Sequence, residues 1–441
     1  MKSFSPSGVP AEQALMLQAA GEEIAKDPLA LFTDLQWFLF EAQDAVFFTA
    51  FSRKSFDAAT LGEIVSQMVG LAPQLSQGYA GALPGRTLPG QVVEAITQLD
   101  VVDSFEGYPD KWIGRSPDIF AAKDLPLFRV QAAVLRNGPD ADGRASIVQV
   151  RASHALLEGA DSALLTRGQS AARNLKLGKV RKVGALARIG SFFHAQFLAW
   201  TYIITANLLA PAEKPWGYKT LAIKRHRLRA LANRLGVRQR SLYFALVTFA
   251  LNGEGPDKHI QKRAIGATYT LLGDNTRNEL EDGYLRFRAL QAKFRVDDDF
   301  LEFVRHVDDT VAKVETQDLT KFLTLMGVMM RTLRGLHRMW DGLPGKRFWR
   351  FNLGIDIALT LVPPHHPYGG LTEGIVEPIY CGAWHPAQNI CTFCPGREYI
   401  TLNFSMEQRH IDNVHKIMPL LERLEGMDLP EPKQRTAAVE A

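Results

Sequence analysis

The chain has 441 residues, of which 46% are hydrophobic, and its formal net charge at pH 7 is only +4. Since one hydrophobic core rarely serves more than about 250 to 300 residues, this length predicts two domains. The small net charge excludes a protein that is strongly basic over its whole surface and binds a polyanion, so no nucleic-acid partner is expected. Three cysteines exclude a disulfide framework, and residues 1–10 lack the pattern of a signal peptide, so a cytoplasmic protein is expected.

The chain is expected to begin with an arm over residues 1–28, before the first predicted strand and helix. The apolar run 45–51 predicts a strand. Asp57 is a suitable N-cap for a helix, and the apolar residues after it follow the i, i+3, i+4 spacing of a helix that packs on a core. Pro73 ends this helix.

A hairpin is predicted next. Two apolar runs, 127–135 and 147–152, flank residues 137–143, which are rich in turn-forming Asn, Gly, Pro and Asp. This pattern is typical of two antiparallel strands joined by a short loop. The second strand leads directly to Ser153 and His154.

His154 lies where the predicted strand ends, and Glu158 and Gly159 follow it four and five positions later. The residues after 160 read as the start of a helix. A side chain at such a strand-to-helix corner can reach a cleft, and histidine suits general base catalysis because its ordinary pKa is about 6.5. The pattern therefore predicts a base held in a fixed pose.

The SHxxxEG pattern of residues 153–159 resembles the HHxxxDG motif of the chloramphenicol acetyltransferase-like superfamily. That superfamily includes condensation domains and the bacterial wax ester synthase/diacylglycerol acyltransferases, whose layout this chain resembles most. The resemblance implies that His154 is the catalytic residue. Ser153 stands in place of the first histidine, Glu158 in place of the aspartate, and Gly159 matches the glycine. These three residues would support the motif structurally.

The same resemblance implies an α/β (α+β) fold of two similar halves, each a mixed sheet with flanking helices. The halves would be related by a pseudo-twofold axis, with the active site in the tunnel between them. The expected N-terminal half, crossover linker, C-terminal half and disordered tail cover residues 29–172, 173–215, 216–429 and 430–441.

The crossover linker begins with a basic run and continues into the aromatic-rich apolar segment 192–204. Polar residues interrupt this segment, so a membrane-spanning helix is not expected. Two alternatives remain open for the linker. It forms a helix packed on the core, or residues 173–210 make peripheral contact with an anionic membrane on its cytoplasmic face.

The C-terminal half is expected to open with a strand over residues 218–223, a helix over 224–235 that ends at Gly236, and a second helix over 241–251. This block resembles the start of the second half in wax ester synthases. Arg240-Ser241 occupies the position of their Asn-Asp pair.

A basic cluster lies on and just after the first helix of this block: Lys224, Arg225, Arg227, Arg229, Arg234, Arg238 and Arg240. It forms either a solvated helix face or a contact with the phosphates of coenzyme A.

The rest of the half predicts a helix, two strand regions and a closing helix, over residues 322–340, 351–361, 390–404 and 412–424. Cys381, His385, Cys391 and Cys394 could supply zinc ligands, but their spacing matches no known zinc module. Ordinary buried thiols and no metal site are therefore expected. His365-His366 lies in a proline-rich segment and is expected at the surface.

The function implied by the resemblance is an acyl-CoA-dependent O-acyltransferase that moves a fatty acyl group from a thioester to a hydroxyl-bearing lipid, such as a long-chain alcohol or diacylglycerol. His154 would act as the general base, through a tetrahedral intermediate. Acyl-CoA would be a co-substrate, and no permanently bound cofactor is expected.

Two other functions remain open. One is a condensation-type enzyme that takes its acyl group from a carrier protein supplied in trans. The other is a non-catalytic lipid-binding or membrane-binding protein that kept the fold, because Ser153, Glu158 and Arg240-Ser241 depart from the family pattern.

Overall fold

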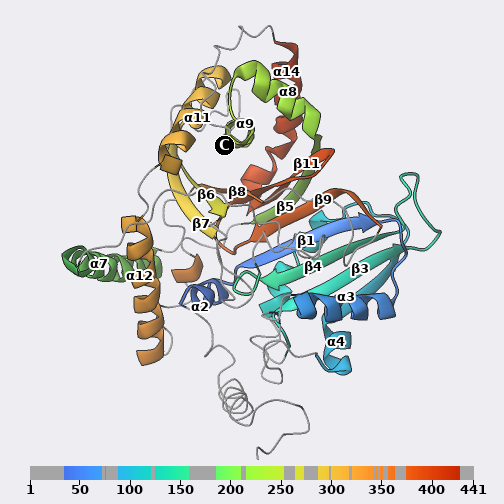
Figure 1. The fold of residues 1–441 in the computed structure, drawn as a ribbon, viewed down its shortest axis with the longest axis horizontal. Helices are drawn as coiled ribbons and strands as arrows, with labels where there is room; N and C mark the ends of the chain where they lie inside the picture. Colours follow the sequence, from blue (N-terminus) through green and yellow to red (C-terminus); the bar gives the residue numbers. More distant parts are fainter. Residues whose placement is uncertain are drawn as a thin grey trace, which may run out of the picture.

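The computed structural model describes residues 34–71, 75, 88–120, 125–157, 185–209, 215–252, 264–272, 287–296, 299–316, 320–340, 343–344, 348–350, 356–362 and 374–427. Several predictions lie outside these residues: the N-terminal arm, Glu158, Gly159, the basic run before residue 185, the His365-His366 segment and the tail. In the described part, two β-sheets meet in the middle of the molecule, with helices above and below them (Figure 1).

The first sheet has five strands in the order β2-β3-β4-β1-β9. These strands are β1 (Ala45–Ser52), β2 (Thr97–Val102), β3 (Phe128–Leu135), β4 (Ser146–Ser153) and β9 (Ile375–Trp384). β2 is parallel to β3, and the other neighbours are antiparallel. The predicted hairpin is confirmed as β3 and β4. Every residue of β1 and β4 is buried, because both strands lie inside the sheet and are covered on both faces.

Short helices accompany this sheet: α2 (Asp34–Glu41), α3 (Ala58–Leu71), α4 (Gly90–Ile96), α5 (Asp110–Ile113) and the 3-10 helix η2 (Ser116–Phe120). The predicted N-cap of α3 is confirmed, since the Asp57 carboxylate accepts the Thr60 backbone N–H at 2.7 Å. Helix α3 buries Leu61, Val65 and Met68 against the sheet, so the predicted helical spacing marks its core-facing side.

The second sheet has six strands in the order β5-β11-β10-β8-β6-β7. They are β5 (Trp216–Lys224), β6 (Ala264–Leu272), β7 (Phe287–Arg295), β8 (Ile357–Leu361), β10 (Ile390–Pro395) and β11 (Tyr399–Glu407). β8 is parallel to both β6 and β10, and the remaining neighbours are antiparallel. Two mixed sheets with flanking helices confirm the expected fold class.

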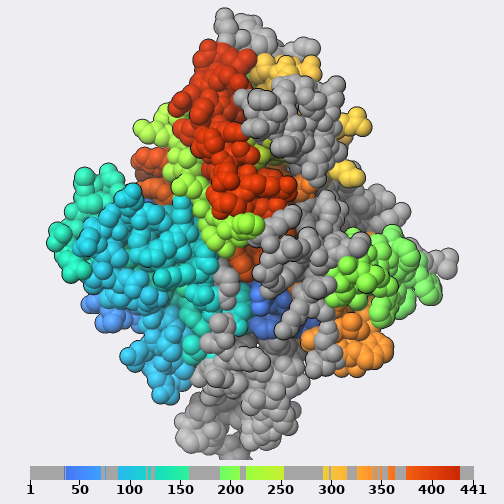
Figure 2. Space-filling view, turned by 180° about the vertical axis from the view of Figure 1, so that it is seen from behind, coloured from blue at the N-terminus to red at the C-terminus, as the bar shows by residue number. Residues whose placement is uncertain are grey.

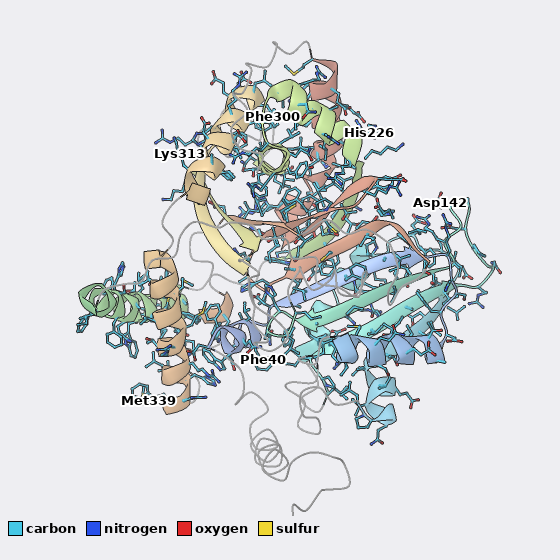
Figure 3. All side chains as sticks on the ribbon, in the orientation of Figure 1. Phe40, Asp142, His226, Phe300, Lys313 and Met339 are labelled. Atoms are coloured by element: carbon cyan, nitrogen blue, oxygen red, sulfur yellow. The ribbon has the colours of Figure 1, made fainter. Side chains whose placement is uncertain are left out.

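The helices of the second half are α8 (Arg225–Leu235), α9 (Gln239–Asn252), α11 (Phe300–Thr316), α13 (Gln408–Ile411), the 3-10 helix η4 (Val414–Lys416) and α14 (Ile417–Gly426). Every residue of α9 from Ser241 to Leu251 is buried, as expected for a helix that is apolar around most of its circumference. In Figure 3, Phe300 and Lys313 mark the two ends of α11, which packs on α9.

Two expected boundaries were wrong. The region 390–404 is a hairpin of β10 and β11 that turns after Pro395, because Gly396 and the two residues after it interrupt the ladder. The closing helix was predicted to begin at Asp412, but α14 begins at Ile417 after a turn and a short 3-10 helix. In both cases the backbone leaves the regular strand or helix at a point that the apolar pattern of the sequence does not mark.

Helices α7 (Ala185–Leu209) and α12 (Thr320–Met339), with the 3-10 helix η3 (Phe348–Arg350), form a projection at one side of the molecule (Figures 1 and 2). The Gln196 side-chain amide donates to the Thr332 hydroxyl at 2.6 Å, which joins the two long helices. Helix α7 lies in the predicted linker. Among the helices of the described residues, α7 included, none has the length and apolarity needed to cross a membrane.

Strand β9 connects the two sheets. Its sequence lies in the predicted C-terminal half, but it pairs with β1 at the edge of the first sheet. Side chains of β11 reach its backbone, since the Thr401 hydroxyl donates to the Ile379 carbonyl at 2.7 Å and the Asn403 amide donates to the Cys381 carbonyl at 2.9 Å. β9 therefore lies beside β1, one strand away from β4, the strand that leads to His154.

Candidate active site

His154 is the first residue after β4, in a turn that the neighbouring backbone holds in place. Its backbone N–H donates to the Asp44 carbonyl at 2.8 Å, which extends the β1–β4 pairing by one residue. Ser153 is fully buried, and its hydroxyl accepts the Ala155 backbone N–H at 3.3 Å. The Gln36 side chain of α2 donates to the Ala155 carbonyl at 3.0 Å. The imidazole therefore starts from a fixed backbone.

Three polar residues form one row across three strands. In the sheet register, Ala45 of β1 lies opposite Ser153 of β4 and opposite Trp384 of β9. The next residue beyond each strand end is then Asp44, His154 and His385. Residues at matching positions of neighbouring strands lie close together. The fold thus assembles two imidazoles and a carboxyl group from three distant segments, and this set is named the His-Asp-His row below.

His385 has a defined tautomer when it is neutral. Its Nδ1 accepts the Ala387 backbone N–H at 2.9 Å, so the single ring proton must sit on Nε2. That Nε2 lies 3.6 Å from Oδ1 of Asp44. The ring therefore presents an N–H group to the carboxyl oxygen, just beyond ordinary hydrogen-bond length.

Burial keeps charge low in this row. It lowers the pKa of His154 to about 4. It also lowers the pKa of His385 to about 4, with a further contribution from the charge of His154. Burial raises the pKa of Asp44 well above its ordinary value. Both rings are therefore neutral at physiological pH, which is the form that accepts a proton.

Each side chain of the row keeps part of its surface exposed. The side chains of Asp44 and His385 keep 16% and 17% of their surface exposed, and His154 is also partly exposed. A separate cavity of about 520 Å³ opens at the opposite end of β1 and β4, beside Phe51 and Arg144, and contains no residue of the row. The predicted tunnel between the halves remains a prediction.

Comparison with known proteins rests on structure. No protein-family model matches the sequence, and no curated protein matches it. The trichothecene 15-O-acetyltransferase from Fusarium sporotrichioides aligns over 86% of this chain and 92% of its own, with 10% identity and a TM-score of 0.51. The first condensation domain of the calcium-dependent antibiotic synthetase aligns over 90% and 95%, with 13% identity and a TM-score of 0.50. A wax ester synthase/diacylglycerol acyltransferase from Marinobacter aquaeolei VT8 aligns over 86% and 92%, with 12% identity and a TM-score of 0.49.

The chain shares its fold with the trichothecene 15-O-acetyltransferase and with the condensation domain of the antibiotic synthetase. The alignments span nearly the whole of each chain, so the likeness covers both sheets. At these identities it establishes the fold alone. The roles of His154, Ser153, Glu158 and Gly159 stay predictions, and the structure describes the first two.

Arg240-Ser241 lies apart from the row. Ser241 is buried at the start of α9, and the neighbouring Arg238 forms an ion pair with Asp308 of α11 at 2.8 Å. Interactions with Arg238 lower the pKa of Asp308 despite its burial. Ser241 therefore lies beside a link between α9 and α11 in the second half.

Some arginines of the basic cluster have partners within the protein. Arg227 forms a bidentate pair with Glu425 of α14, at 2.6 and 2.9 Å. Arg234 donates to the backbone carbonyls of Glu425 and Met427. These arginines hold α8 against α14, which favours a structural role for them over contact with coenzyme A phosphates. His226, labelled in Figure 3, marks α8 in the second half.

The three cysteines are free thiols and are all buried. Cys391 packs in the core of the second half, whereas Cys381 and Cys394 pack in the core of the first half. Burial raises the pKa of Cys391 and of Cys394 well above the ordinary value. Their environment is that of small apolar side chains.

Asp44 and His385 were not predicted from the sequence as active-site residues. Asp44 directly precedes the predicted strand 45–51, so its place at a strand end was visible. His385 was considered only as a metal ligand, because Pro378 and Gly382 interrupt the strand pattern of β9. Nothing local in the sequence indicates that β9 pairs with β1.

Proposed function

We propose that this protein is an acyl-CoA-dependent O-acyltransferase in which His154 is the general base. The observation that carries the proposal is the neutral, partly accessible imidazole at the end of β4, at the position that the SHxxxEG pattern predicts. The fold supports it, since a solved neighbour is a trichothecene 15-O-acetyltransferase. The acceptor in this proposal is a hydroxyl-bearing lipid, such as a long-chain alcohol or diacylglycerol.

One imidazole can carry out both proton transfers of the proposed reaction. The acceptor hydroxyl attacks the thioester carbonyl while its proton passes to His154, which gives a tetrahedral oxyanion and an imidazolium. The C–S bond then breaks, and the departing thiolate takes the proton back. No acyl-enzyme forms. A pKa of about 4 makes the neutral ring a weak base but makes the imidazolium a strong acid, which favours the second proton transfer.

The test is release of free thiol from a long-chain acyl-CoA with and without a long-chain alcohol or diacylglycerol. The proposal expects acceptor-dependent thiol release that falls about 10²- to 10⁴-fold in His154→Ala, the usual contribution of a general base. The control is His415→Ala, an exposed histidine near the C-terminus that should leave the rate unchanged. Equal rates in the wild type and His154→Ala would reject His154 as the base.

A condensation-type function is the second candidate. The condensation domain of the antibiotic synthetase aligns with a TM-score of 0.50 over 95% of its length, so the fold favours neither class. Its acyl donor would be an acyl carrier protein acting in trans. Transfer from an acylated carrier without transfer from acyl-CoA would select this alternative. Folded protein that transfers from neither donor would select the non-catalytic lipid-binding alternative.

Peripheral contact with an anionic membrane belongs to the same proposal. Helix α7 exposes an apolar stripe, named here the α7 stripe, whose members lie three or four residues apart except for the adjacent Phe192 and Phe193: Ile189, Phe192, Phe193, Phe197, Trp200, Ile204 and Leu208. The stripe lies on the side projection (Figure 2). The neighbouring α12 adds the exposed Arg331 and Arg338, and Met339 at its end, labelled in Figure 3.

The aromatic stripe and adjacent arginines suit the boundary between acyl chains and anionic headgroups. Flotation with phosphatidylcholine vesicles, with and without phosphatidylglycerol, tests this contact. We expect flotation that needs the anionic lipid and that is lost in a Phe193→Ser, Phe197→Ser, Trp200→Ser variant. The matched control changes exposed apolar residues of β2, Leu99→Ser and Val101→Ser, and should still float. Loss of a dimer in the α7 variant, without any flotation of the wild type, would show that a second copy covers the stripe.

A further inference from the structure

The His-Asp-His row contains two ionisable groups, Asp44 and His385, besides the proposed general base. Oδ1 of Asp44 is buried and has no hydrogen-bond partner within the described residues, and Nε2 of His385 lies 3.6 Å from it. An unpartnered buried carboxyl oxygen is costly, so folded proteins rarely keep one without a reason. Hydrogen bonds in unliganded active sites are often slightly long and tighten when substrate binds.

The groups of the row are also electrostatically coupled. The charge of His154 lowers the pKa of His385, so the two rings resist being protonated together. The titratable groups that face one another here come from three elements: Asp44 before β1, His154 after β4 and His385 after β9. His385 Nδ1 is occupied by the Ala387 N–H, which leaves its Nε2–H directed at Asp44 and not available as a base.

We propose that Asp44 and His385 are positioning residues for the reaction at His154. His385 orients the Asp44 carboxyl group through its Nε2–H, and an oxygen of that carboxyl group accepts the N–H of the imidazolium that forms when His154 takes the acceptor proton. This inference rests on the proposed function. It assigns the hydrogen-bond acceptor for the imidazolium to Asp44, a residue outside the SHxxxEG pattern, in a set that β9 completes.

The proton balance is unchanged by these residues. The acceptor O–H proton moves to His154 as the O–C bond forms, and it leaves with the thiolate as the C–S bond breaks. Asp44 and His385 exchange no proton with the substrate. Their effect is confined to the imidazolium state, so removing them should lower kcat and leave KM almost unchanged.

The experiment compares Asp44→Leu, His385→Leu and His385→Gln with the wild type in steady-state thiol release. Leucine at position 44 removes the acceptor oxygen. At position 385 the glutamine amide can place an N–H near the position of Nε2, whereas leucine cannot. We expect kcat to fall about tenfold or more in Asp44→Leu and His385→Leu, with partial recovery in His385→Gln. His337→Leu controls for general loosening, since His337 is a half-buried histidine of α12 outside the row and should keep the wild-type kcat.

A second readout separates this inference from the proposed function. NMR titration of the imidazoles should show that the pKa of His385 rises in His154→Gln, because the charge on its neighbour is gone. If His154→Ala abolishes activity but Asp44→Leu and both His385 variants keep the wild-type kcat, the positioning role is wrong and the acyltransferase stands. If no variant and no wild-type protein transfers acyl groups, the proposed function fails, and a shifted His385 titration still establishes the coupled row.

Discussion

His154 is an uncharged histidine because its surroundings cannot solvate an imidazolium. Burial lowers the pKa of His154 to about 4, and the ring stays neutral through the whole physiological range. The sequence indicates the residue and its place at the end of a strand. It does not indicate the burial, since that depends on Asp44 and His385 arriving from other strands.

The first prediction concerns pH. If His154 is the base, kcat/KM for thiol release should stay level from pH 8 down to about 5 and should be halved near pH 4, where His154 becomes protonated. An ordinary histidine would instead give half the rate near pH 6.5. The measurement is the pH dependence of kcat/KM after brief exposure to each buffer, and a midpoint near 6.5 would contradict the buried environment.

The pH dependence of folding stability should reflect the same buried groups. In the unfolded chain His154 and His385 bind protons near pH 6.5, but in the folded protein only near pH 4. At these two histidines the unfolded state therefore binds more protons in this window, so their contribution to the free energy of unfolding should decrease as the pH falls from 6.5 to 4. The raised pKa of Asp44 acts in the opposite direction. Replacing both histidines with glutamine should flatten that part of a urea-denaturation series. An unchanged slope would show that neither ring is buried as described.

Individual elements follow local rules where the sequence supplies a clear signal. Gly236 ends α8 with a φ of +65°, a left-handed conformation that glycine adopts without strain, as the sequence predicted. Asp57 caps α3 for an equally local reason. β9 was missed because Pro378 and Gly382 interrupt its apolar residues. Gly382 is required by Phe47 of the neighbouring strand β1, whose ring leaves no room for a side chain.

The second prediction concerns Gly382. It lies opposite Phe47 of β1, and a Cβ there would collide with the phenylalanine ring. Gly382→Ala should therefore lower the free energy of unfolding by about 1 to 3 kcal/mol, the usual cost of overpacking. Gly327→Ala is the control, because a Cβ at this position of α12 meets nothing within 4 Å, and it should stabilise the helix by up to about 1 kcal/mol. Urea denaturation measures both, and equal effects would contradict the β1–β9 contact.

At the scale of the whole molecule, β9 makes the two sheets depend on each other. Its Glu377 carboxylate accepts the backbone N–H groups of Glu398 at 2.8 Å and of Tyr399 at 3.0 Å, in the turn between β10 and β11. The same carboxylate also accepts the Arg397 N–H. One side chain on the first sheet thus fixes a turn of the second.

The third prediction tests this link. Glu377→Gln places an amide group where three backbone N–H donors need an acceptor, so the free energy of unfolding should fall by about 1 to 3 kcal/mol. The link between sheets should also weaken, and unfolding followed by fluorescence and by circular dichroism should no longer give coincident transitions. Glu398→Gln is the matched control, an exposed residue of the same turn that should change neither. Coincident, unshifted transitions in Glu377→Gln would contradict the link.

The sequence alone determined the features that local chemistry specifies. These are the β3–β4 hairpin, the helix ends at Asp57 and Gly236, the helix α9 and the place of His154 after a strand. The mixed two-sheet fold class was implied by the family resemblance of the SHxxxEG pattern. Only the tertiary structure decided which groups surround that histidine. The pairing of β9 with β1 joins segments that are far apart in the sequence. A local sequence pattern shows that a strand can be buried and can form backbone hydrogen bonds, but it does not show which strand will be its partner. Asp44 and His385 become neighbours of His154 through that pairing.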